Sequence, residues 1–173
     1  MARKVSARDK IIDAFYKECE KKHYCDLQVS EITKLAGVNR GTFYEYFDDI
    51  ESINEAAQTE LLADMVTTIL AVTDKNPNAT MEEYIEAVFD AHFSKARIFC
   101  NYADNGFIAR LTNTMKPFMY LVLGLSDKSE QNESLVYFAL AGVTGFVASA
   151  KKSEPAKSAK TLTKLITAMA EGI

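Results

Sequence analysis

A glycine at residue 37 separates two short helical segments, and this interruption constrains the N-terminal fold more than any other feature. The segment Val29–Ala36 has helical spacing, with Ile32, Leu35 and Ala36 expected on its inner side. Gly37 ends it, because glycine adopts the left-handed conformation of a helix terminus without strain. Asn39 is a favourable N-cap for a third helix through Phe47. The pattern therefore predicts two short helices joined by a tight turn.

A longer amphipathic helix is expected before this pair, from Ser6 to about His23. Ile11, Phe15 and Cys19 recur every four residues along it. Apolar residues of the following pair are spaced to pack together and against Ile11 and Phe15: Ile32, Ala36, Val38, Phe43 and Phe47. The first 48 residues thus predict a compact three-helix unit.

The remainder of the chain also has helical patterns, and glycine (7) and proline (3) are too few for a turn-rich sheet protein. One apolar stripe runs through Ile50, Ile53, Ala57, Leu61, Met65 and Ile69. A fourth helix is expected to begin at Asp48–Asp49. Helical pattern then runs from Thr80 to Leu125, with breaks expected at residues 104–106 and at Pro117. Two further helices are expected at 133–151 and 157–172. We therefore predict an all-α fold with domains at residues 1–48 and 49–173.

The charge is unevenly distributed between these two domains. The whole chain carries a formal charge of −4, which argues against coating of nucleic acid by bulk attraction. Residues 1–47 hold nine basic and seven acidic side chains, whereas residues 48–173 hold eleven and seventeen. A mildly basic first domain on an acidic second one suits a local nucleic-acid contact.

Several other classes of protein are disfavoured. The three cysteines form no CxxC pair, which is typical of reduced thiols in a cytoplasmic protein. Residues 135–150 form the most apolar run, but 16 residues are fewer than the roughly 20 needed to cross a bilayer. The two histidines lie far apart, and no phosphate-binding loop, nucleophile elbow or metal-ligand spacing is found. We expect no enzyme, metal, cofactor or membrane segment.

The expected third helix carries the residues with a chemical role. Arg40 lies in its first turn, where a guanidinium can pair with guanine O6 and N7 in the major groove. Gly41 would let the backbone approach DNA closely, and the hydroxyls of Thr42 and Tyr44 suit phosphate oxygens. The candidate DNA-binding set is Gln28, Asn39, Arg40, Gly41, Thr42, Tyr44 and Tyr46. The alternatives are a solvated surface arginine and tyrosines that only cover a small core.

The run AGVNRGTFYEYF, residues 36–47, resembles the tetracycline-repressor (TetR) family, and the similarity extends over roughly residues 8–55. The resemblance implies that the third helix reads the major groove and that Thr42 and Tyr44 contact phosphates. It also implies a homodimer formed by the last two helices, 133–151 and 157–172, and a small-molecule effector bound in the second domain. Two positions depart from the family pattern: Thr33 replaces an alanine, and Ile50 replaces a lysine that helps to hold a phosphate.

The second domain offers candidates for an effector site. Ligand cavities are mostly apolar with a few polar groups, and the candidates are His92, Phe93, Phe99, Tyr102, Phe118 and Tyr137. At helical spacing, the same aromatic residues are also consistent with a plain core. Ala139, Gly142, Gly145 and Ser149 would allow close helix approach within one chain or between two.

Two functional hypotheses follow. The first is a cytoplasmic, dimeric, ligand-responsive repressor that binds a near-palindromic DNA operator. The alternative keeps the same fold as a ligand-independent regulator or protein-interaction module, for which the acidic second domain would provide the binding surface.

Overall fold

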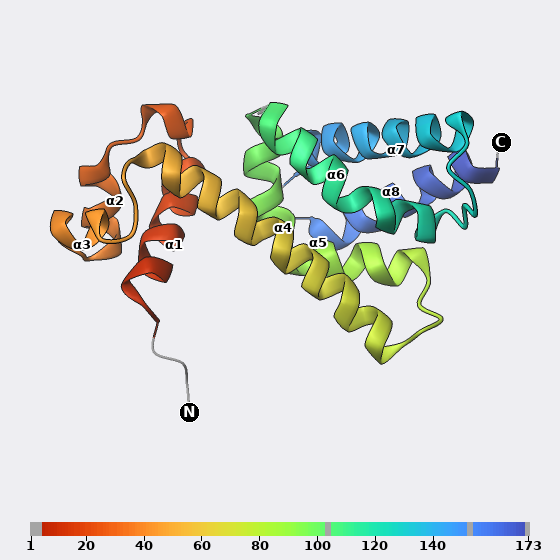
Figure 1. Ribbon diagram of the computed structural model, residues 1–173, viewed down its shortest axis with the longest axis horizontal. Coiled ribbons are helices and arrows are strands. Elements are labelled where there is room, and N and C mark those ends of the chain that lie inside the picture. The colour runs from red at the N-terminus through yellow and green to blue at the C-terminus, as the bar shows by residue number, and fades with distance from the viewer. Residues whose placement is uncertain (1–4, 103–104, 152–153, 172–173) are drawn as a thin grey trace. The chain divides into compact units, whose positions relative to one another are not determined.

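The computed structural model describes residues 5–102, 105–151 and 154–171. Within these residues the chain forms eight α-helices and one short 3-10 helix, with no strand (Figure 1). The predicted all-α fold is therefore confirmed. Internal contacts divide the chain into two compact units, Met1–Glu60 and Leu61–Ile173, which we call the head and the body.

The head begins with α1, Ala7–Cys19. The Ser6 hydroxyl accepts from the Asp9 N–H, and the Asp9 carboxylate accepts from the Ser6 N–H, so the two form a capping box. The helix ends four residues before the expected end at His23. A 3-10 helix, Tyr24–Asp26, follows and leads to the buried Leu27.

The two short helices lie close to where the sequence places them. Helix α2 spans Val29–Ala36, and Gly37 ends it with φ +66° in the left-handed region. Helix α3 spans Arg40–Tyr44, so it is shorter than expected. One burial expectation is wrong: Leu35 is 45% exposed, and Thr33 is buried instead.

The head core is made by side chains from all of its helices. Ile11 and Phe15 of α1, Ile32 of α2 and Phe43 of α3 are fully buried. The Tyr16 hydroxyl donates to the carbonyl oxygen of Ala57 at 2.9 Å, in the first part of α4. The core fixes the orientation of α3, and the candidate interface depends on that orientation.

Helix α4, Ile50–Lys75, extends from the head into the body. The Asp49 carboxylate accepts from the Ser52 N–H at 2.8 Å, and the Ser52 hydroxyl oxygen accepts from the Asp49 N–H at 3.1 Å. The predicted start near Asp48–Asp49 is thus explained by a reciprocal cap. The predicted stripe is buried from Ile53 to Ile69, and Ile50 at its beginning is half-buried.

The body adds four further helices: α5 at Met81–Asn101, α6 at Asn105–Val122, α7 at Glu130–Ser149 and α8 at Pro155–Glu171. Thr80 and Glu83 form the expected capping box of α5. Helix α7 begins three residues earlier than expected because Ser129 caps it. Helix α8 begins at Pro155, a residue well suited to the first helical position. Residue 172, the expected end of this helix, lies outside the described residues.

Helix α6 continues through Pro117, where a kink or restart is expected from the sequence. Proline cannot donate to the carbonyl four residues earlier, that of Asn113. Both residues are exposed, so water can satisfy that carbonyl. Helix α5 packs against α7 and α8, and α6 packs against α7 (Figure 1).

Candidate nucleic-acid interface

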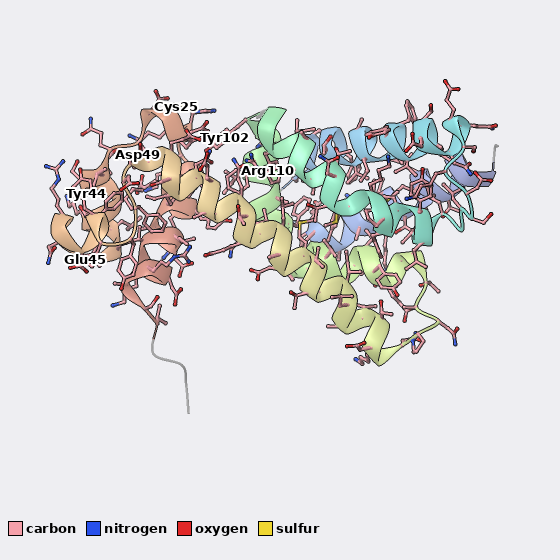
Figure 2. The ribbon with its side chains drawn as sticks, in the orientation of Figure 1. Cys25, Tyr44, Glu45, Asp49, Tyr102 and Arg110 are labelled. Atoms are coloured by element: carbon pink, nitrogen blue, oxygen red, sulfur yellow. The ribbon has the colours of Figure 1, made fainter. Side chains whose placement is uncertain are left out.

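Helix α3 separates its core side chain from its candidate contact residues. Phe43 is fully buried and meets the ring of Tyr44 edge-on, with 5.3 Å between ring centroids. Tyr44 itself is 52% exposed, and its side chain is labelled in Figure 2. The exposed residues include Gln28, Asn39, Arg40, Gly41 and Tyr46, and Thr42 is half-buried. Apart from Gln28, which caps the start of α2, the candidate set therefore lies on α3 and its flanks.

Asn39 has the capping role that the sequence predicts, in addition to its predicted DNA contact. Its Oδ1 accepts from the Thr42 N–H at 2.7 Å and so caps α3. A Cβ added at Gly41 would lie 3.1 Å from the same Oδ1. The cap therefore favours glycine at this position on structural grounds alone.

Two substitutions separate the cap from the predicted DNA contact. Asn39→Ala removes the cap, and we expect it to destabilise the protein by about 1 kcal/mol, seen as a lower Tm. Asn39→Asp keeps a capping oxygen but places a negative charge at a predicted DNA contact. We expect it to preserve Tm and to weaken DNA binding. Equal DNA affinity of Asn39→Asp and the wild type would argue against a contact at this position.

Gln28 and Arg40 line the same open cleft of the head, which has a volume of about 600 Å³. Tyr24 and Ser30 also line it, and sequence reasoning did not select either. The segment before α2 is held by Lys22, whose ammonium donates to both carboxylate oxygens of Glu31 at 2.8–2.9 Å. The Lys22 hydrogen bond, aided by the Gln28 N–H, holds the pKa of Glu31 below its usual range.

One part of the wall of this cleft is acidic. It is formed by the start of α4, where Asp49, Ile50 and Glu51 line the cleft. Asp49 is labelled in Figure 2. Carboxylates repel phosphate, and Ile50 supplies no compensating charge, so this part of the wall is a poor place for a phosphate.

The second departure from the family pattern is accommodated. The Thr33 hydroxyl is buried in α2 and donates to the carbonyl oxygen of Ser30 at 3.2 Å. A buried hydroxyl with a partner avoids most of the cost of its desolvation.

The body contains an apolar cavity of about 90 Å³. Of the six sequence candidates for effector binding, Phe118 lines it, and the other five are not among its lining residues. Phe93 stacks on Phe89 with 5.1 Å between centroids, and Phe99 packs against Phe107 at 5.0 Å. Tyr102 is half-buried just after α5 (Figure 2).

The two remaining candidates make polar contacts elsewhere. His92 Nε2 lies 2.8 Å from the Thr68 hydroxyl, and burial lowers the pKa of this histidine. Tyr137 is exposed, and the Lys116 ammonium lies 4.7 Å from its ring centroid. Both contacts explain these residues without a ligand.

Helices α7 and α8 share an apolar surface groove of about 270 Å³. Phe138 and Leu165 line this groove and are 70% and 56% exposed. Gly142 of α7 also lines it. Both exposed side chains line the same groove, and contiguous exposed apolar surface is a feature of protein–protein contact sites. Among the described residues, no helix is both long and apolar enough to cross a membrane.

The three-helix head with an exposed, capped third helix has the arrangement of a helix-turn-helix unit. Residues 11–57 match the family model described as bacterial regulatory proteins, tetR family. The head of this chain is therefore similar to this family of bacterial regulatory proteins.

Solved structures of such regulators are similar along nearly the whole chain. The dihydroxyacetone kinase operon activator DhaS aligns with a TM-score of 0.65 at 15% identity, over 98% of this chain and 97% of that one. The fatty acid degradation regulator FadR from Bacillus halodurans gives 0.60 at 20% identity, over 98% and 95%. The TetR family repressor AlkX from Dietzia sp., implicated in n-alkane biodegradation, gives 0.56 at 15% identity, over 95% and 97%. At these identities the similarity establishes the fold of the body.

Proposed function

We propose that the chain is a sequence-specific transcription regulator that binds a near-palindromic operator as a homodimer and represses transcription. The observation that carries this proposal is the division on α3 between buried Phe43 and the exposed pair Arg40 and Tyr44. An arginine in the first turn of such a helix can read guanine. The tyrosine hydroxyl can bind a DNA phosphate and so fix the position of the protein on the duplex. The protein acts in the cytoplasm, where a bacterial operator lies.

The dimer is proposed to form through α7 and α8. Their apolar groove and the exposed Phe138 and Leu165 match the apolar centre of a dimer interface. A two-fold assembly places two recognition helices about one DNA turn apart, roughly 34–36 Å, and this spacing requires a pseudo-palindromic site. Repression needs only occupation of promoter DNA, whereas activation also needs a contact with the transcription machinery.

Effector response is proposed to depend on α4, because this helix belongs to both units. A ligand changes DNA affinity only if it binds the DNA-competent and DNA-incompetent states with different affinities. The cavity lies beside the body part of α4, where Met65 and Ile69 line it. A ligand there would favour one placement of this helix.

Fluorescence anisotropy on duplexes selected from a random pool tests DNA binding directly. We expect a selected duplex to be preferred over a scrambled one by about a thousandfold or more. Affinity should fall steeply with salt, because phosphate contacts release counterions. The absence of any sequence preference or salt dependence would refute the proposal.

Ile50 provides a gain-of-function prediction. Ile50→Lys introduces a cation beside Asp49 and Glu51 at the cleft of the head. We expect tighter operator binding, by about three- to tenfold at low salt, and a salt slope steeper by about one unit. The matched variant Ile50→Gln, which is polar but neutral, should leave the slope unchanged. Equal slopes for all three proteins would place this position away from phosphate.

A further inference from the structure

The cavity of the body is bounded by side chains from α4 to α8. Its walls are aliphatic and aromatic, and three methionines contribute to them: Met65, Met115 and Met119. Among the described residues that line it, none is an acid, a lysine, an arginine or a histidine. A charged ligand group inside would therefore lack an ionic partner, and burial of an unpaired charge is strongly unfavourable.

The few polar side chains in the wall either already donate a hydrogen bond within the protein or carry no charge. The Thr144 hydroxyl donates to the carbonyl oxygen of Ala141 at 2.8 Å. The Tyr84 hydroxyl lies 2.9 Å from the hydroxyl of Thr73, whose own proton goes to the carbonyl oxygen of Ile69 at 3.1 Å. Burial raises the pKa of the Cys100 thiol to about 12, so this group carries no charge at neutral pH. The wall thus offers little to a carboxylate or a phosphate.

The volume and the methionines bound the size of an occupant. A dry apolar cavity of about 150 Å³ holds benzene or xenon in other proteins, and this one measures about 90 Å³. Methionine side chains have three rotatable bonds and adapt to irregular shapes. A ring of six carbons therefore requires the wall to expand, and these three methionines are the side chains best suited to move.

We propose that the effector of this regulator is a small neutral hydrocarbon, about the size of benzene or toluene, bound in this cavity. The proposal rests on the ligand-responsive function proposed above and specifies its ligand class. The cavity wall selects neutral over charged ligands, because burial of apolar ligand surface is favourable there and a charged group finds no ionic partner.

A matched ligand pair tests this, since toluene and benzoate differ by a methyl group and a carboxylate on the same ring. Thermal unfolding of the full chain is measured with each ligand at equal concentration. We expect toluene at about a hundredfold excess over its Kd to raise Tm by about 5 °C or more. Benzoate should change Tm by less than about 1 °C. A benzoate shift as large as that of toluene, or no toluene shift, would overturn the proposal.

Filling the cavity locates the binding site. Ala96→Leu adds a larger side chain to the wall, whereas Ala91→Leu makes the same change on the exposed face of α5. We expect the toluene shift to vanish in the first variant and to persist in the second. Val143→Leu, a smaller addition to the same wall, serves if Ala96→Leu does not fold, and should reduce the shift. An unchanged toluene shift in a folded filling variant would place the ligand elsewhere.

Operator affinity separates this inference from the proposed function. We expect toluene to weaken operator binding of the wild type by at least about fivefold, and not that of Ala96→Leu. Operator binding without any toluene effect refutes the effector proposal alone. A toluene shift in Tm without operator binding refutes the proposed regulator and leaves the cavity ligand intact.

Discussion

The double substitution Arg40→Ala/Tyr44→Ala is expected to weaken operator binding by about a hundredfold or more without changing Tm or the oligomeric state. Both side chains are exposed on α3, so their removal costs little packing. A bidentate arginine–guanine pair provides about 1–3 kcal/mol of discrimination, and loss of a phosphate contact adds to this. Anisotropy titration against selected and scrambled duplexes measures the effect.

The two single variants should differ in kind. Arg40→Ala should lose preference for one base position, whereas Tyr44→Phe, which removes only the hydroxyl, should weaken all duplexes alike. Lys17→Ala is the control, because it removes one exposed positive charge from α1 of the same head. If Lys17→Ala and Arg40→Ala lose the same operator affinity, Arg40 contributes only its positive charge and not a base-specific contact.

Leu165→Glu is expected to convert the proposed dimer to a monomer and to reduce operator affinity with it. Leu165 is 56% exposed at the α7–α8 groove, beside Phe138. A carboxylate there would be buried without a partner in the dimer, while in the monomer it stays in water. A monomer also holds one half-site at a time and loses the gain in affinity from bivalent binding.

Leu70→Glu makes the same exchange at a leucine with nearly equal exposure, 57%, on α4 and outside the groove. Sedimentation velocity at about micromolar concentration distinguishes the two variants. We expect the control to sediment with the wild type and Leu165→Glu to sediment as a monomer. A Leu165→Glu variant that remains dimeric would move the interface away from this groove.

The local elements of the head could be predicted because their signals are local. Gly37 ends α2 through a conformation that glycine alone adopts easily, and Asn39 starts α3 with a hydrogen bond to a residue three positions later. The same holds for Thr80 and Glu83 at the start of α5. The candidate residues around α3 followed from these bounds.

The cleft of the head could be predicted only in part. Gln28 and Arg40 were candidates, but Tyr24, in the short 3-10 turn before α2, and Ser30, in the first turn of α2, also line the cleft. No periodic pattern marks such a turn. Similarly, Asn54 and Gln58 of α4 are buried and hydrogen-bonded to each other at 3.0 Å, where a polar residue is ordinarily expected on the outside.

The sequence by itself determined the helices, their caps and the residues that share each helix face, because these depend on interactions within a few positions of the chain. Only the tertiary structure decided which face meets which neighbour. In the folded chain Leu35 is exposed and Thr33 is buried. Phe118 lines the cavity of the body, whereas Phe93 and Phe99 do not. Helical spacing groups side chains on one stripe, but the packing of separate helices determines whether that stripe meets a core, a cavity or a partner.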